Sequence, residues 1–415
     1  MDPVLLVLSG GQSEYREYML GKIAERYPIV LLTPDPVTWE REYITAELRI
    51  DPADTAEIVA TARRAAQRYA VAGVLTYHEP CVELAAVIAA ELGVPRCPPQ
   101  GAARCRDKWA TRLALDADGV PSAAAELVTS AAEAAEAAAR IGYPVVVKPR
   151  SLSASFGVSK VDCPAELEPA FDRAFASGLP EPWEHHSGVL VEEYLDGPEI
   201  SVDSAVHGGV VESPVFARKV LGYPPHFEEL GHVVADPADL VADPQQVRDV
   251  VRAAHSALGV DNTVTHTELR LTARGPRLVE VNGRSGGDLI PDLAELATGV
   301  DMAAAAADVA AGVPPTLRVV RSRVAGIRFF YTDESGVVDA LELDAAEGEL
   351  PWLHRVTWLV EPGTLIRPEP GRRYFARIGF AVVVAGSVSE CEQRMAKVAE
   401  LVRVRTTGRA RSNRR

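Results

Sequence analysis

The sequence is poor in cysteine and has no long apolar run, and each shortage excludes a class of protein. Its 415 residues include only 5 cysteines, none in a CxxC pair, so we expect neither a disulfide-stabilised secreted domain nor a cysteine zinc site. The first apolar run is about six residues long without a basic residue before it, and nothing later approaches roughly 18 apolar residues. We therefore expect a reduced, cytoplasmic protein that does not span a membrane.

Positive charge is also scarce. The chain has 43 Lys plus Arg against 58 Asp plus Glu, which gives a formal net charge of −15. Residues 403–415 hold six arginines and no acid, so the rest carries 37 minus 58, or −21. This surplus repels a phosphate backbone and argues against nucleic-acid binding, but it leaves room for a local basic pocket that holds a small phosphate compound.

The length predicts two to three domains at roughly 150 residues each. Apolar runs at 4–8 and 29–33 alternate with helical periodicity at 55–70 and 83–92, which predicts an open α/β layer up to about residue 95. A Gly-Gly turn follows the first run without GxGxxG spacing, so a dinucleotide-dependent oxidoreductase is not favoured.

The rest of the chain reads as mixed α+β and then strand-rich. Helices are expected over 107–118, 131–141 and 389–402, and strands over 143–149, 188–194, 199–206, 264–271, 277–282, 324–332 and 375–386.

Lys148 lies in the run VVVKP and is followed by the serine-rich segment 150–160. A lysine on a strand that is buried on at least one face must reach solvent or find an anion. The backbone N–H groups of the serine- and glycine-containing segment could surround phosphate oxygens. A plain strand-end lysine remains the alternative.

Acidic residues dominate two further segments. Glu192 and Glu193 precede Tyr194 and Leu195, where an extended backbone could read an adenine edge, and Glu199 could accept hydrogen bonds from a ribose diol. Solvated acids at a strand end are the alternative interpretation.

Glu268 and Glu280 lie in two β-type segments joined by a Gly-Pro turn, so a hairpin brings them together. Two carboxylates about 4 Å apart repel by roughly 4 kcal/mol at an effective dielectric of 20, and a cation offsets that cost. With the carbonyl oxygen of Asn282, the oxygen ligands suit Mg²⁺ better than zinc. Arg284 follows in a glycine-rich turn and could clamp a carboxylate or an acyl phosphate. Outward-pointing acids on an edge hairpin are the alternative.

Together, VVVKP with its Ser/Gly loop, VEEYLDGPE, HTEL and VEVNGRSGGDLIPDLAELATGVDM resemble the ATP-grasp superfamily, specifically its dipeptide-forming amino acid ligases. The similarity spans about residues 70–320. It implies a three-domain ATP-grasp architecture of α/β and α+β class: an N-terminal open α/β domain (1–105), a central ATP-grasp domain (106–316) with a flap subdomain at about 120–190, a small strand-rich C-terminal lobe (317–403) and a disordered basic tail (404–415).

The resemblance also implies a role for each matching position. The phosphate-binding lysines are Lys108 and Lys148, under a flap that contains Ser151, Ser153, Ser155 and Gly157. The adenine-binding residues are Glu192, Glu193, Tyr194 and Leu195, with Glu199 on the ribose. The metal ligands are Glu268, Glu280 and Asn282. Arg284 lies beside the reacting carboxylate, and Gly286 and Gly287 of the same turn are substrate-site residues. The flap has fewer glycines than many relatives, and Glu193 stands where relatives often have Lys.

The implied reaction uses ATP and Mg²⁺, with Mn²⁺ as a substitute, to convert a carboxylate to an acyl phosphate that an amine then attacks. The expected substrates are small molecules, amino acids above all, and the expected assembly is a homodimer. The polar segment 218–232 is interpreted as a lid loop that brings Lys219 and His232 to the reaction, and Glu79 as a ligand for a substrate amino group; an ordinary surface loop and a surface helix start are the alternatives. His266 is expected to be a hydrogen-bonded strand residue rather than a catalyst. A purine-biosynthetic or biotin carboxylase type of ATP-grasp enzyme and a non-catalytic ATP-binding scaffold are the rival functions.

Overall fold

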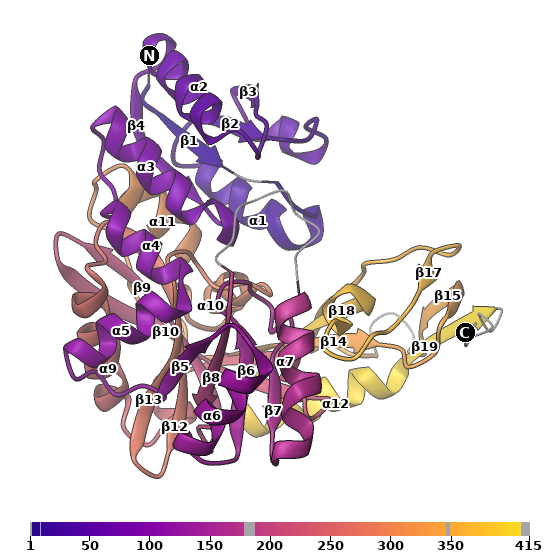
Figure 1. Cartoon of the computed structure of the whole chain (residues 1–415). Coiled ribbons are helices and arrows are strands. Elements are labelled where there is room, and N and C mark those ends of the chain that lie inside the picture. The colour runs from indigo at the N-terminus through magenta and orange to yellow at the C-terminus, as the bar shows by residue number, and fades with distance from the viewer. Residues whose placement is uncertain (1, 9, 178–186, 346–348, 408–415) are drawn as a thin grey trace.

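The computed structural model describes residues 2–8, 10–177, 187–345 and 349–407. The chain forms an N-terminal layer, a small sheet with two helices, and a large sheet that continues into the C-terminal region (Figure 1). In the described part of the chain, no helix is both long enough and apolar enough to cross a membrane.

The N-terminal layer is a parallel sheet of order β3-β2-β1-β4, made of Ala46–Arg49, Ile29–Thr33, Val4–Leu8 and Val71–Thr76. Strands β1 and β2 are buried along their whole length, which is why both read as continuous apolar runs. Helices α2 (Thr55–Arg68) and α3 (Val82–Leu92) pack on one face, and α1 (Ser13–Ala24) with α11 (Met302–Ala310) on the other.

The small sheet is antiparallel, with the order β5-β8-β6-β7: Ala125–Val128, Val189–Glu193, Val145–Pro149 and Ser159–Val161. Helices α6 (Ala131–Ile141) and α7 (Leu167–Ala176) bury its apolar face. Its strands β6 and β8 place Lys148 beside Glu192.

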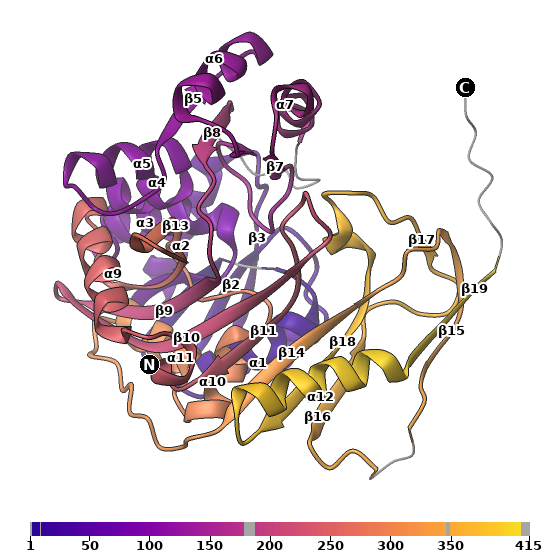
Figure 2. The ribbon, with the colours of Figure 1, turned by 90° about the horizontal axis from the view of Figure 1, so that it is seen from below.

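The large sheet has eight strands in the order β13-β12-β9-β10-β11-β14-β18-β16. They are Gly275–Asn282, Thr263–Thr272, Glu199–His207, Val210–Gly222, Glu228–Ala235, Val324–Tyr331, Arg377–Ala385 and Leu353–Trp358. The remaining helices that frame the sheet are α4 (Pro99–Arg106), α5 (Lys108–Ala117), α8 (Pro237–Leu240), α9 (Pro244–Leu258), α10 (Ile290–Thr298) and α12 (Val388–Leu401). Figure 2 shows the long strands crossing the molecule with α12 running beneath them.

Two features differ from the sequence expectations. Residues 218–232 are not a lid loop, because they belong to the antiparallel hairpin β10–β11, where Lys219 pairs with His232 across the strands. Residues 404–407 are not part of a disordered tail, because they lie in β19 (Val402–Thr407). That strand forms a small sheet with β15 (Gly336–Leu343) and β17 (Leu365–Ile366); residues 408–415 lie outside the described part.

Candidate active site

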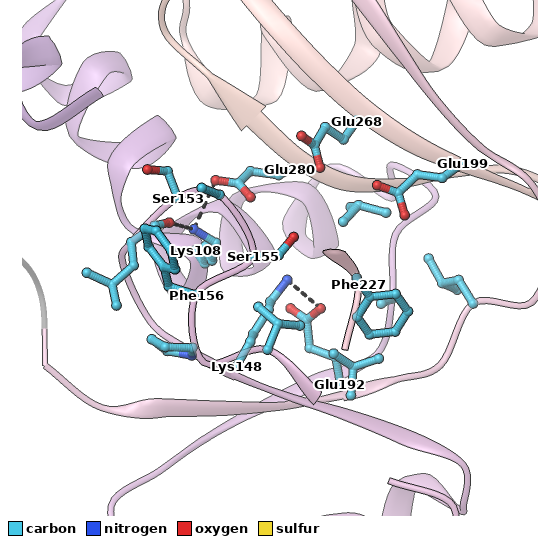
Figure 3. A pocket seen from close by; sticks show the side chains of 18 of the residues that line it. Lys108, Lys148, Ser153, Ser155, Phe156, Glu192, Glu199, Phe227, Glu268 and Glu280 are labelled. Atoms are coloured by element: carbon cyan, nitrogen blue, oxygen red, sulfur yellow. Dashed lines mark hydrogen bonds and ion pairs between the residues drawn. The ribbon is translucent and has the colours of Figure 1, made fainter. Parts of the chain in front are cut away.

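A cleft of about 900 Å³, counted with the open solvent at its mouth, separates the small sheet from the large one. Figure 3 shows Lys148 and Glu192 on one wall and Glu268, Glu280 and Glu199 on the other. The lining includes the sequence-predicted Lys108, Lys148, Ser151, Ser153, Ser155, Glu192, Glu193, Tyr194, Leu195, Glu199, Lys219, Glu268, Glu280, Asn282 and Arg284. Lys108 and Arg284, which are 176 positions apart in the sequence, therefore line the same site.

Lys148 is buried on β6, and its Nζ lies 2.7 Å from Glu192 Oε2 on β8. The same carboxylate accepts hydrogen bonds of 2.9 and 3.1 Å from Arg112 on α5. Burial disfavours the ionised carboxyl, but Arg112 and Lys148 together keep the pKa of Glu192 below its ordinary value. Burial lowers the pKa of Lys148 against the pull of Glu192. The two cations and one carboxylate leave a positive wall.

Lys108 begins α5, where the Asp107 side chain caps the helix by accepting from Trp109 N–H. Its Nζ donates to the carbonyl of Leu152 at 2.6 Å and lies 2.9 Å from Glu280 Oε1 (Figure 3). Lys108 thus links the serine-rich segment to the acidic hairpin.

The serine-rich segment lies over the cleft in a conformation dominated by left-handed backbone. Leu152, Ala154, Ser155 and Gly157 have φ values of 112°, 54°, 56° and 71°. Phe156 anchors the segment, since its ring stacks on Phe375 with centroids 4.8 Å apart. The segment connects β6 and β7 of the small sheet, and Phe375 ties it to the C-terminal lobe.

Glu268 on β12 and Glu280 on β13 are direct cross-strand partners, as the hairpin predicted, and both side chains face the cleft. Each is already close to a cation: Glu268 Oε1 is 3.1 Å from Lys219 Nζ, and Glu280 is paired with Lys108. Burial opposes the ionised form of Glu268, yet Lys219 and then His266 hold its pKa well below the usual range. Both sites of negative charge therefore face the cleft.

The donor set of this hairpin fits a divalent cation. Asn282 ends β13 with its amide against Glu280 and Glu79. The Asn282 amide can take two orientations. In the first, its nitrogen donates to the carbonyl of His266 at 3.4 Å, and its oxygen lies 3.2 Å from Glu280 Oε1. The turned amide satisfies its hydrogen bonds to Glu280 and Glu79, whereas a bound cation would favour the first orientation. Two carboxylates with an amide oxygen are the hard ligands that Mg²⁺ prefers.

Lys219 lies at the centre of the acidic wall. Its Nζ is 2.9 Å from Glu199, 2.9 Å from Glu229 and 3.1 Å from Glu268. Burial opposes the charged amine, but these three carboxylates raise the pKa of Lys219 well above its ordinary value. Lys219 therefore reaches the cleft as a fixed strand residue, and the lid-loop interpretation of its position was wrong.

The far end of the cleft carries aromatic rings and a charged pair. Glu199 Oε2 lies 2.8 Å from Arg270 on β12. Tyr194 and Phe227 have ring centroids 6.4 Å apart, and Lys160 Nζ lies 4.7 Å from the Tyr194 ring centre. Phe227 has no counterpart among the sequence predictions.

Arg284 follows β13 and is ion-paired with Glu79 at 2.7 Å, which in turn meets Arg106 at 3.2 Å. Burial opposes the charge on Glu79, but Arg284 above all and then Arg106 keep its pKa low. Glu79 is 4% exposed, so the alternative of a surface helix start was wrong. The Glu79 carboxylate therefore already has two cationic partners, and it is not among the residues that line the cleft.

His232 is brought to a second cluster, which the sequence did not reveal. Its Nε2 lies 3.2 Å from Asp288 Oδ2, and Arg377 of β18 donates to both Asp288 oxygens at 2.7 and 2.9 Å. Glu229, His232 and Asp288 could together offer ligands to a metal ion. Arg377 and Lys219 already neutralise the two acids, so a cation gains little there.

Three comparisons with known proteins agree with this geometry. The ATP-grasp domain family matches residues 141–292, and L-amino acid ligase C-terminal domain 2 matches residues 328–407. An uncharacterised protein of Sinorhizobium fredii (strain NBRC 101917 / NGR234) is 30% identical over 97% of this chain and 83% of its own length. The alanine–anticapsin ligase of Bacillus amyloliquefaciens is 28% identical over 61% of this chain and 57% of its own length.

The fold has a close counterpart among solved structures. A crystal structure of an L-amino acid ligase from Bacillus licheniformis matches with a TM-score of 0.81 at 22% identity, over 98% of this chain and 100% of that one. This match confirms the predicted α/β and α+β architecture. The exact domain boundaries remain predictions.

Proposed function

The chain belongs to the ATP-grasp ligases with the C-terminal domain of the L-amino acid ligases, and we propose that it joins the carboxylate of one amino acid to the amine of another. Glu268 and Glu280 are direct partners on adjacent strands, and together they face Lys148 across the cleft. This arrangement is the observation that carries the proposal. The proposal includes a cytoplasmic location and a homodimeric assembly.

The nucleotide is proposed to lie along the cleft with its base near Tyr194, Leu195 and Phe227. Backbone groups of the segment after β8 would read the adenine edge. Because these contacts do not depend on the side chain of residue 193, having Glu193 where relatives often have Lys does not prevent binding. Glu199 would accept from the ribose diol. A flat base packs well against the aromatic rings at this end of the cleft.

The triphosphate is proposed to reach Lys148 and Lys108, which would exchange their carboxylate partners for phosphate oxygens. The N–H groups of the serine-rich segment, with Ser151, Ser153 and Ser155, would close over it. Glu268, Glu280 and the Asn282 oxygen would hold Mg²⁺, or Mn²⁺ in its place. When bound, this ion would neutralise the charge on the phosphates.

In the proposed reaction an oxygen of the substrate carboxylate attacks the γ-phosphorus, the bond to the β-phosphate breaks and ADP leaves. The amine nitrogen of the second substrate then attacks the acyl carbon, loses a proton and expels inorganic phosphate. Arg284 would balance the negative charge on the acyl phosphate. Gly286 and Gly287 have no side chains, so the turn would leave room for the acyl phosphate beside the backbone. Lys219 would supply a further fixed positive charge.

A phosphate-release screen over amino acid pairs with ATP and Mg²⁺, followed by mass measurement of the product, tests this proposal. Wild type should release phosphate and form a dipeptide with at least one pair. Glu280→Ala should lose that activity because a metal ligand is gone, whereas Glu212→Ala, an exposed acid on β10, should keep it.

Near-normal turnover of Glu280→Ala would contradict the metal assignment. Phosphate release that needs bicarbonate or a ribonucleotide instead of amino acids would favour the purine-biosynthetic or biotin carboxylase type. ATP binding without phosphate release under any of these conditions would favour a scaffold.

A further inference from the structure

A buried ion pair lies directly behind the acidic hairpin. His266 of β12 and Asp203 of β9 are cross-strand partners, with Nδ1 2.6 Å from Oδ1. The two residues are 5% and 1% exposed, and neither is among the residues that line the cleft. A group in this place can act on the reaction only through other residues.

The imidazole connects this pair to one wall of the cleft. His266 and Glu268 are two positions apart on β12, so their side chains project from the same face of the strand. His266 Nε2 lies 3.4 Å from Glu268 Oε1, the carboxylate oxygen that also meets Lys219. The Glu268 carboxylate therefore has two partners, His266 on its own strand and Lys219 on β10.

The carboxylate connects the pair to the turn that carries Arg284. Asp203 uses its second oxygen, Oδ2, to accept a hydrogen bond of 2.9 Å from the N–H of Gly286. A Cβ at Gly286 would lie 2.9 Å from that oxygen, closer than real Cβ atoms approach, and 3.0 Å from His266 Nδ1, which is tighter than most such contacts. A larger residue at this position would therefore displace Asp203 or His266. The same contact positions Arg284, two residues earlier in the turn.

The buried His255 shows what a purely structural histidine looks like in this fold. It is 1% exposed, and its two ring nitrogens contact the Val251 carbonyl at 2.6 Å and Thr265 Oγ1 at 2.7 Å. Its hydrogen bonds lead to helix α9 and the strand start, and it does not line the cleft. His266 differs because its partners lead to a proposed metal ligand and to the arginine turn.

We propose that Asp203 and His266 are positioning residues that fix the Glu268 carboxylate and the Arg284 turn as one unit. The inference rests on the proposed function, since it assumes that Glu268 holds the divalent ion. Partners of this kind behind a metal ligand orient it, and their removal typically weakens metal binding or activity by about 10- to 100-fold.

The test is a titration of the full-length enzyme with Mn²⁺ in the presence of ADP. The electron paramagnetic resonance signal of free Mn²⁺ measures how much of the ion is bound. His266→Leu should weaken Mn²⁺ binding at least tenfold, and His266→Gln should recover part of the loss because an amide can still donate to Glu268. The control is His255→Leu, which removes an equally buried imidazole and should leave Mn²⁺ affinity within twofold of wild type. Circular dichroism checks that each variant is folded.

Asp203→Asn keeps the shape of the side chain and serves if His266→Leu does not fold. It should weaken Mn²⁺ binding at least threefold, because a neutral amide does not hold the imidazole in its orientation. Mn²⁺ affinity within twofold of wild type in the folded His266→Leu variant, or in Asp203→Asn where the first is unfolded, would overturn the inference. A wild-type enzyme that binds no Mn²⁺ with ADP would instead refute the proposed function.

Discussion

Replacing Glu192 by glutamine removes the one carboxylate that lies between the buried cations Lys148 and Arg112. Its oxygens are 2.7 Å from Lys148 and 2.9 Å from Arg112. At an effective dielectric of 20, each attraction has a gross size of about 6 kcal/mol, of which desolvation cancels much. Because the pKa of Glu192 is lowered, the carboxyl is ionised at neutral pH and the substitution removes a full charge.

We expect Glu192→Gln to lower the free energy of unfolding by about 3–5 kcal/mol, the usual cost of leaving a buried charge without its partner. Urea denaturation at pH 7 without nucleotide measures this loss. The neighbouring Glu193→Gln is the matched control, since Glu193 pairs with Arg274 and both side chains are partly exposed, at 27% and 53%. That variant should lose about 0.2–1 kcal/mol.

A nucleotide adds a second arm to the experiment. If the triphosphate takes the place of Glu192 beside Lys148, a non-hydrolysable ATP analogue with Mg²⁺ should stabilise Glu192→Gln more than it stabilises wild type. A loss below about 1 kcal/mol without nucleotide, comparable to the usual effect of an exposed pair, would show that Glu192 does not stabilise the two buried cations.

Three further predictions concern other parts of the molecule. Asp288→Asn leaves the buried Arg377 with its hydrogen bond to Tyr331 and, among the described residues, with Glu229 at 3.5 Å as its one carboxylate partner. It should lower the free energy of unfolding by about 3 kcal/mol in urea denaturation, and an unchanged free energy would show that the Arg377–Asp288 pair does not stabilise the fold. Phe375→Ala removes the ring stacked on Phe156 and should raise the KM for ATP about 2- to 10-fold with little change in kcat, and an unchanged KM would speak against the flap contact. Burial lowers the pKa of His255 to about 4, so the unfolded chain binds a proton more readily than the folded one. The free energy of unfolding should therefore fall by about 3 kcal/mol as the pH drops from 6.5 to 4. His255→Leu should remove this pH dependence from denaturation curves, and an unchanged dependence would contradict the assignment.

Much of the fold follows from local patterns in the sequence. The continuous apolar runs of β1 and β2 predicted buried parallel strands, and two β-type segments around a Gly-Pro turn predicted that Glu268 and Glu280 would meet. Both inferences depend only on residues that are close in the sequence. They needed no knowledge of the rest of the chain.

The β10–β11 hairpin escaped prediction because its environment is tertiary. Lys219 and His232 make the segment look like a polar loop, and Pro224 and Pro225 interrupt it. A lysine becomes acceptable inside a sheet only when acids surround it. Glu229 comes from the hairpin itself, but Glu199 and Glu268 come from β9 and β12. No local periodicity encodes that arrangement.

The same reason hid several site residues. Arg112 reaches Glu192 across 80 positions, and Arg377 reaches Asp288 across 89. Asp203 reads as one polar residue on a strand until the register places it opposite His266. Long-range pairing therefore decides which polar residues act together.

If ATP activates a substrate carboxylate, an oxygen label on that carboxylate must appear in the released phosphate. The enzyme is incubated with ATP, Mg²⁺ and a mixture of amino acids whose carboxyl groups carry ¹⁸O, and the released phosphate is analysed by mass spectrometry. We expect phosphate that contains one ¹⁸O atom, because the labelled oxygen leaves with the phosphate when the amine attacks the acyl carbon. Phosphate released without the label would contradict it.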